Sequence, residues 1–151
     1  MKTRGFEIAS GWENKDIRLP RRQTAHAAAY DIEAAEDTVV PKFQPGVKPT
    51  LVATGLKAYC QPDECYFVFN RSSGASKGLV LANGVGIIDA DYYNNPENDG
   101  HFRVVVFNVT DQDLLIKKGD RIAQVVFQKF LTIDGDVATG KRKGGFGSTG
   151  S

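Results

Sequence analysis

Residues 65–88, CYFVFNRSSGASKGLVLANGVGII, decide the fold class of this chain. They hold three short runs rich in Val, Ile, Phe and Tyr, at residues 65–70, 79–82 and 85–88. Turn formers such as Ser72-Ser73-Gly74 and Asn83-Gly84 separate the runs. The first run is aromatic enough to suit the interior of a barrel or a sandwich. This stretch therefore predicts closely spaced β-strands.

The same pattern extends in both directions along the chain. Residues 51–60, 102–109 and 122–131 are β-rich, and residues 103–109 are almost continuously apolar, as in a strand covered on both faces. Two helical alternatives fail. Residues 31–37 are short and polar, and residues 114–130 contain Gly119 and the strand-forming Val125-Val126-Phe127. We predict an all-β fold.

Length and charge limit the organisation of the chain. Its 151 residues suit one domain, at roughly 150 residues per domain. The 19 Lys and Arg residues and the 18 Asp and Glu residues give a net charge of +1, so we expect no direct nucleic-acid or membrane partner. Residues 1–133 carry the β pattern. Residues 134–151 are glycine-rich with almost nothing to bury, which predicts a flexible tail.

The cysteines indicate neither disulfides nor a metal. Cys60 and Cys65 have four residues between them, unlike the two of a redox or zinc pair. Only the distant His26 and His101 could join them as zinc ligands, so we expect two free thiols. No signal-peptide stretch and no apolar run near ~20 residues occur, which predicts an intracellular, cytoplasmic protein.

The tail contains two literal matches to phosphate-binding motifs. Residues 145–150 match G-x-G-x-x-G, but no helix can follow them before Ser151. Residues 135–141 approach a Walker A loop, but Arg142 stands where Ser or Thr must bind Mg²⁺. What remains is a basic, glycine-rich segment whose amides and cations suit a polyphosphate. A lid over an anion and a disordered basic terminus both stay open.

Asp89 and Asp91 follow the apolar pair Ile87-Ile88 at alternate positions. They do not form a calcium loop, because Tyr93 takes the third ligand position and the turn glycine is missing. Alternate residues of a strand share a face, so both carboxylates could point the same way. Carboxylates beside an apolar run are candidate bases, and a solvated turn after a strand is the alternative.

Five segments together resemble the five motifs of the trimeric dUTPase family, the dUTP diphosphatases, in the family's order. They are residues 28–34 (AAYDIEA), 71–73 (RSS), 83–92 (NGVGIIDADY), 119–124 (GDRIAQ) and 144–150 (GGFGSTG). We call them the first to fifth motifs. The third and fifth are the most specific, and the resemblance spans residues 28–150.

The resemblance implies a distorted jelly-roll-like β-barrel subunit in a homotrimer with active sites at subunit interfaces. Each site would combine the first, second and fourth motifs with the third motif of a neighbour, beneath the tail of another subunit. The reaction would be Mg²⁺-dependent hydrolysis of dUTP to dUMP and pyrophosphate, which limits uracil incorporation into DNA. Triphosphate and water would hold the Mg²⁺ without a direct protein ligand, with Asp31 in the outer shell at most.

The resemblance also gives the third motif its roles. Asp89 would orient and deprotonate the water that attacks the α-phosphorus. Tyr92 would lie against the deoxyribose and exclude a ribose 2′-hydroxyl, with a packing tyrosine as the alternative. Asn83 and the backbone of residues 84–88, which include Gly86 and Ile88, would pair with the edge of uracil and leave no room for the methyl group of thymine.

The remaining motifs would hold the phosphates. Arg71, Ser72, Ser73 and Gln124 would contact them, with Arg71 also a partner for Asp91 or part of a purely structural ion pair. In the fifth motif, Phe146 would stack on uracil while Gly147, Ser148 and Thr149 grip the terminal phosphate. The family's tail arginine would be Arg142, with Lys141 as second choice, because a planar guanidinium suits phosphate better.

Two positions depart from the family pattern. Ala29 stands where the first motif usually has Gly, so the backbone there must avoid positive φ or accept strain. Residues 94–100 stand where the family commonly continues with Gly-Glu, and Asn94 can adopt the left-handed turn that Gly would. The role of this longer loop, including a role toward a protein partner, stays open.

Three other functions were weighed. A dCTP deaminase would share the fold, but would need a carboxylate base at the amino group of the pyrimidine and no Gly-Phe-Gly tail. A nucleotide sensor without turnover is opposed by the intact Asp89 and Phe146. A structural β-domain without a ligand is the least favoured.

Overall fold

The computed structural model describes residues 1–144 and shows a nearly all-β molecule. The strands are β1 (Gly5–Ile8), β2 (Tyr30–Glu33), β3 (Thr38–Val40), β4 (Thr50–Ala53), β5 (Leu56–Tyr59), β6 (Glu64–Phe69), β7 (Leu79–Leu81), β8 (Gly86–Asp89), β9 (Arg103–Asn108), β10 (Leu114–Ile116) and β11 (Arg121–Lys129). One short helix, α1 (Ser72–Ser76), and one 3₁₀ turn, η1 (Ala90–Tyr92), interrupt them. The all-β prediction is confirmed.

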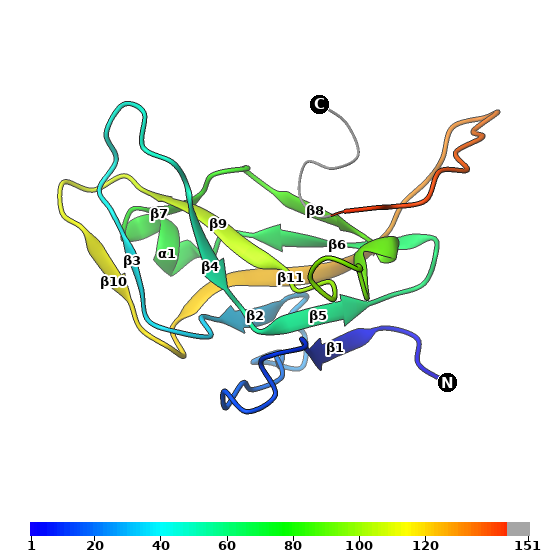
Figure 1. Cartoon of the computed structure of the whole chain (residues 1–151), viewed down its shortest axis with the longest axis horizontal. Coiled ribbons are helices and arrows are strands. Elements are labelled where there is room, and N and C mark those ends of the chain that lie inside the picture. Colours follow the sequence, from blue (N-terminus) through cyan, green and yellow to red (C-terminus); the bar gives the residue numbers. More distant parts are fainter. Residues whose placement is uncertain (145–151) are drawn as a thin grey trace.

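The strands form four antiparallel sheets (Figure 1). The largest has the order β2-β11-β6-β8, and a second has the order β4-β9-β7. The pairs β1-β5 and β3-β10 complete the set. Strand neighbours that are far apart in sequence, such as β2 and β11, bring the first and fourth motifs side by side.

The core lies between the sheets and is filled by alternate residues of each strand. Its largest fully buried side chains include Tyr66 of β6 and Phe102 before β9, whose rings make an edge contact at 5.5 Å. Strand β9 buries Val104, Val106 and Asn108 but leaves the residues between them half-buried. The prediction that this strand is covered on both faces is therefore wrong for a single chain.

A glycine divides the predicted run at residues 51–60 into two strands of different sheets. Gly55 has φ +70°, and a Cβ there would lie 2.9 Å from Cγ1 of Ile17. A side chain at this position would therefore meet both backbone strain and a clash. The turn sends β4 to β9 and β5 to β1.

After β11 the chain forms no further helix or strand within the described residues. Figure 1 shows residues 130–144 running out beyond the sheet and then doubling back toward β8. No helix among the described residues is long and apolar enough to cross a membrane.

Candidate active site

The third motif lies on an edge strand. Within residues 1–144, β8 pairs only with β6, from Cys65 opposite Asp89 to Val68 opposite Gly86. The other edge of β8 therefore offers backbone N–H and C=O groups to a ligand. Gly86 packs tightly on β6, since a Cβ there would lie 3.2 Å from Cβ of Val68. Asn83, in the turn before β8, is exposed.

Side chains of β8 alternate between the core and the surface. Ile88 is 5% exposed, whereas Ile87 is 65% exposed and the Asp89 side chain 57% exposed. The strand ends at Asp89, and Asp91 belongs to η1. The expectation that strand alternation puts both carboxylates on one face is therefore wrong.

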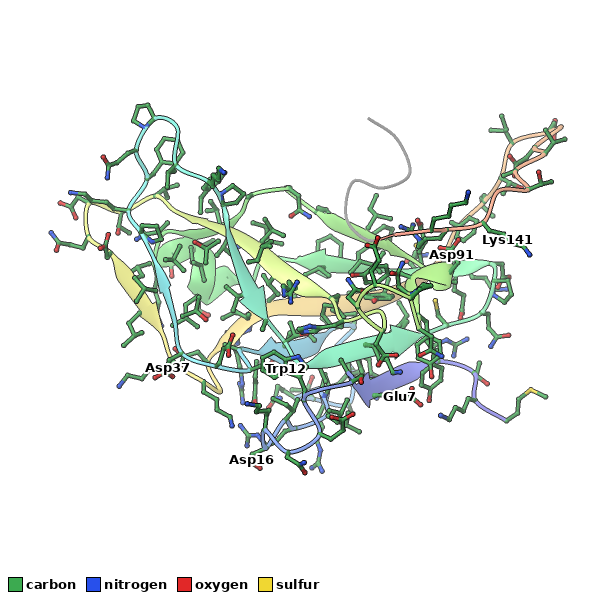
Figure 2. The ribbon with its side chains drawn as sticks, in the orientation of Figure 1. Glu7, Trp12, Asp16, Asp37, Asp91 and Lys141 are labelled. Carbon is green, nitrogen blue, oxygen red and sulfur yellow. The ribbon has the colours of Figure 1, made fainter. Side chains whose placement is uncertain are left out.

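The two carboxylates nevertheless meet at one cation, Arg142 of the returning tail. Its Nε donates to Asp91 at 2.8 Å, and its Nη2 donates to Asp89 at 2.5 Å. Both carboxylates, Asp91 first, raise the pKa of Arg142. Figure 2 shows the labelled Asp91 beside the returning segment that carries Lys141. Arg142, preferred to Lys141 from the sequence, is thus the tail cation that reaches the third motif.

Tyr92 is 3% exposed, and its hydroxyl both donates and accepts a hydrogen bond. Its hydroxyl donates to the carbonyl of His101 at 3.1 Å and accepts from Nδ2 of Asn98 at 2.6 Å. Burial raises the pKa of the hydroxyl. The guanidinium of Arg142 lies 5.8 Å from the centre of the ring, so Tyr92 packs in the core and also faces the tail cation.

The first, second and fourth motifs meet around Asp31 of β2. Arg71 Nε donates to Asp31 at 2.8 Å, and Arg71 Nη1 donates to Oγ of Ser73 at 3.0 Å. Arg121 Nη1 lies 3.9 Å from the other oxygen of Asp31. Within one chain, Arg71 pairs with Asp31 and not with Asp91. The register between β2 and β11, which places Gln124 opposite Asp31, brings the first and fourth motifs together, and the pairing of β6 with β11 brings the second motif beside them.

Gln124 and Ser72 complete this group. Nε2 of Gln124 donates to the carbonyl of Asn70 at 2.9 Å, which fixes its amide. Ser72 is exposed at the start of α1. These residues form a polar surface directly beside the Asp31 and Arg71 pair.

A cleft of about 540 Å³ adjoins this surface and is rich in arginine. Its lining includes Asp31, Arg121 and, from the N-terminal segment, Arg18 and Arg21. Arg18 is held by Glu33 at 2.7 Å. The sequence analysis did not single out Arg18 and Arg21. The high density of arginines in residues 18–22, just before the first motif, was the feature of the sequence that could have indicated them.

The two groups of motif residues lie apart within one chain. Along β6, Asp89 pairs with Cys65 whereas Gln124 pairs with Phe69, a spacing of four residues or roughly 13 Å along the strand. Strands β11 and β6 also separate Asp31 on β2 from Asp89 on β8. Within one chain the third motif therefore lies apart from the first, second and fourth motifs.

Other predictions have mixed outcomes. Both cysteines are free thiols, as predicted, and burial raises the pKa of Cys60 to about 11. Ala29 is not among the residues with positive φ, whereas Asn94 has φ +59°, as the left-handed turn requires. Phe146, Gly147, Ser148 and Thr149 lie outside the described residues.

Residues 1–144 contain no group of three or more His, Cys, Asp or Glu side chains that could hold a metal ion. Asp31 is engaged by Arg71 and Arg121, so its oxygens already face cations. The arginines and serines around it are donors, which suit the oxygens of a phosphate chain.

Comparison with known proteins assigns this arrangement to a family. The dUTPase family model matches residues 15–150. Deoxyuridine 5'-triphosphate nucleotidohydrolase of Lactococcus lactis is 51% identical over 154 residues and covers 100% of both chains. The Desulfitobacterium hafniense protein of the same name is 40% identical, with 95% of each chain covered.

A solved structure has the same fold. The crystal structure of dUTPase from Streptococcus mutans superposes with a TM-score of 0.80 at 47% identity. It covers 87% of this chain and 99% of that one.

Proposed function

The chain belongs to the dUTPase family, and on that premise we propose that it hydrolyses dUTP to dUMP and pyrophosphate with Asp89 as the base. The identity of 51% over the whole chain to a nucleotidohydrolase of that name carries the activity. The assignment of Asp89 rests on its position, at the end of an edge strand with an exposed carboxylate.

The free edge of β8 recognises uracil. Within residues 1–144, β8 pairs on one side only, with β6. The backbone of residues 84–88, which includes Gly86 and Ile88, would offer donors and acceptors like those of a complementary base along its other side. Asn83 flanks them from the preceding turn. Because Gly86 and Ile88 are packed against β6, this edge cannot retreat to admit a 5-methyl group.

Asp89 accepts a proton from the attacking water. The water oxygen bonds to the α-phosphorus, the bond from that phosphorus to the bridging oxygen breaks, and pyrophosphate leaves with the bond electrons. The carboxylate lies outside the core, where water reaches it. It needs no metal ligation for this role.

Arg71, Ser72, Ser73 and Gln124 hold the phosphate chain. The bonds from Arg71 to Asp31 and to Ser73 fix the plane of the guanidinium beside the cleft that Asp31 lines. The neighbouring Arg121 and Arg21 add positive charge to the same cleft. Because these side chains are mainly hydrogen-bond donors, Mg²⁺ would be held by phosphate oxygens and water, and when bound it would supply positive charge to the leaving pyrophosphate.

Arg142 exchanges partners when substrate binds. Without substrate its guanidinium neutralises Asp89 and Asp91. Phosphate oxygens compete for the same planar donors, so the triphosphate draws Arg142 away and frees Asp89 for the water. Phe146, Gly147, Ser148 and Thr149 then follow Arg142 over the nucleotide as a lid.

A homotrimer with shared active sites is part of this proposal. The separation of roughly 13 Å along β6 between the two motif groups supports a site built from the third motif of one chain and the first, second and fourth of another. Exposed apolar side chains on the strands supply an interface, among them Val39 (58%), Leu51 (53%) and Leu115 (55%). Exposed apolar side chains that lie together on a surface commonly mark a protein–protein interface.

The first experiment is pyrophosphate release with Mg²⁺ from dUTP, UTP, dTTP and dCTP, for the wild type and Asp89→Asn. We expect release from dUTP alone and a loss of at least about 100-fold in the variant, because the amide cannot accept the proton. Asp63→Asn removes the same charge from an exposed site paired with Lys129 and is the control. Ammonia release from dCTP, or nucleotide binding without hydrolysis, would instead indicate the deaminase or the sensor.

A further inference from the structure

The turn at residues 94–100 is unusually well fixed for an exposed loop. Lys57 Nζ donates to Oδ1 of Asn94 at 2.7 Å and lies 2.9 Å from Oδ2 of Asp99, which also accepts from the amide of Ser10. A Cβ at Gly100 would lie 2.6 Å from the carbonyl oxygen of Tyr92, so the chain closes tightly behind the tyrosine. The turn is therefore a rigid platform at the end of the third motif.

Asn95 and Asn98 use their side-chain amides in the same way: the oxygen accepts a hydrogen bond within the turn, and the nitrogen donates outside it. Oδ1 of Asn95 accepts from the amide of Glu97 at 3.0 Å, and Oδ1 of Asn98 accepts from the amide of Gly100 at 3.1 Å. Backbone amides need an acceptor, so these contacts fix which side of each amide faces inward. Both Nδ2 groups are then left to donate to partners outside the turn.

The two outward donors reach different parts of the site. Nδ2 of Asn98 donates to the hydroxyl of Tyr92. Nδ2 of Asn95 donates to the carbonyl of Gly144 at 2.8 Å, and Asn95 is 3% exposed. Gly144 is itself buried and is the first residue of the fifth motif. A buried carbonyl that receives a buried amide is a specific docking contact, because either group alone would be left unsatisfied.

We propose that Asn95 is a positioning residue for the lid: it holds the carbonyl of Gly144 and so sets where the fifth motif begins. This proposal rests on the proposed function, in which the residues after Gly144 close over dUTP. Arg142 contacts Asp89 and Asp91 two residues earlier, and an arginine contact alone leaves the following chain free to swing. With Asn95 as a second anchor, the chain is held at both residue 142 and residue 144 before substrate arrives.

The anchor lowers the cost of closure. Each residue held in place beforehand is one whose conformational freedom is not lost when the lid closes. Loss of the anchor should therefore raise the KM for dUTP, while the closed complex, once formed, reacts at nearly the same rate. A purely structural role for Asn95 would instead lower the melting temperature.

The test uses Asn95→Asp in the full-length protein. The carboxylate still accepts from the amide of Glu97, but it repels the carbonyl of Gly144. Asn94→Asp is the matched control, since it adds the same charge one residue earlier, keeps the acceptor for Lys57 and tolerates the left-handed φ of +59°. Asn95→Ser is the second variant, because its hydroxyl can accept from Glu97 without charge but is too short to reach Gly144.

Trypsin cleavage after Arg142 at pH 8, followed by intact mass, reports the anchor without any catalysis. We expect both Asn95 variants to be cleaved at least about threefold faster than the wild type and Asn94→Asp, with KM for dUTP raised about three- to tenfold and kcat changed less than about twofold. Unchanged cleavage in both variants overturns the proposal, as does a fall in melting temperature that accounts for the change.

The outcomes separate the two proposals. If none of the proteins, the wild type included, hydrolyses dUTP, but the Asn95 variants are still cleaved faster than the wild type, the anchor is supported and the proposed function is refuted. Normal hydrolysis with equal cleavage and equal KM in all proteins would refute the anchor alone.

Discussion

Tyr92 combines two tasks that usually belong to different residues. It is a core side chain at 3% exposure, and its ring faces the guanidinium of Arg142. The bonds from Asn98 and to His101 prevent rotation of the ring. We predict that Tyr92 excludes a ribose 2′-hydroxyl, because a ring embedded in the core in this way cannot move aside without disrupting the packing around it.

Replacing Tyr92 by Leu should reduce the preference for dUTP over UTP by about tenfold, because a smaller, unanchored side chain makes room for the hydroxyl. Tyr92→Phe keeps the ring and should keep most of the preference. The measurement is the ratio of kcat/KM for the two nucleotides. If Tyr92→Leu remains folded with its preference intact, the exclusion of ribose belongs to another residue.

At the scale of the elements, most strands were predictable from sequence and their partners were not. Strands β6, β7, β8, β9 and β11 follow the predicted runs to within about two residues, since each run is rich in Val, Ile, Leu, Phe or Tyr and turn formers separate the runs. The residues GFEI of β1 and TVV of β3 were not predicted, although these strands are as long as β8 and β7. Helix α1, SSGAS, has no large apolar residue and was predicted as a turn.

The candidate site shows the same limit. The resemblance placed Asp89, Arg71 and Gln124 in motifs, but could not give the partner that Arg71 has within the chain. That partner depends on the pairing of β2 with β11, which joins residues about 90 positions apart and is settled by packing across the whole sheet. The 94–100 turn was likewise visible in the sequence without any indication that it holds the tail.

The tail behaves as an element although it forms no helix or strand among the described residues. Deleting residues 144–151 should lower dUTP hydrolysis at least about tenfold, because the deletion removes both the anchor at Asn95 and the proposed lid. Arg142 remains in this truncation and still pairs with Asp89 and Asp91. Steady-state kinetics and the mass in solution would be measured together, and full activity in an intact oligomer would refute the lid.

At the scale of the whole molecule, the outer sides of the sheets favour assembly. Leu115 and Val39 are directly opposite each other on β10 and β3, and both are exposed in the single chain. Leu115→Glu should convert the proposed trimer to monomers, because assembly would bury an unpaired carboxylate. Leu115→Met keeps the apolar contact and should remain trimeric. Light scattering gives both masses, and a trimeric Leu115→Glu would move the interface to other strands.

The stability of the whole fold should depend on His101, which joins three parts of the chain. Its Nε2 accepts from the amide of Gly55 at 2.9 Å and faces the amide of Thr54, its carbonyl accepts from Tyr92, and Trp12 packs on its ring at 5.3 Å. Nε2 must be unprotonated to accept these bonds. Burial, followed by the positive charge of Arg103, lowers the pKa of His101 from 6.5 to about 4.

The direction of the pH effect follows from this shift. Between about pH 6.5 and pH 4 the unfolded chain binds a proton at His101 and the folded chain does not, so stability is complete above pH 6.5 and falls as the pH drops toward 4. Over that range the wild type should lose on the order of 2 kcal/mol more than His101→Gln, whose amide accepts from Gly55 but does not titrate. Urea unfolding at a series of pH values measures the free energy of unfolding of both proteins. Subtracting one pH profile from the other removes the contribution of the acidic residues that both proteins share. Parallel pH profiles would mean that the imidazole is not held neutral by this contact, and a steeper loss in His101→Gln would contradict the sign of the shift.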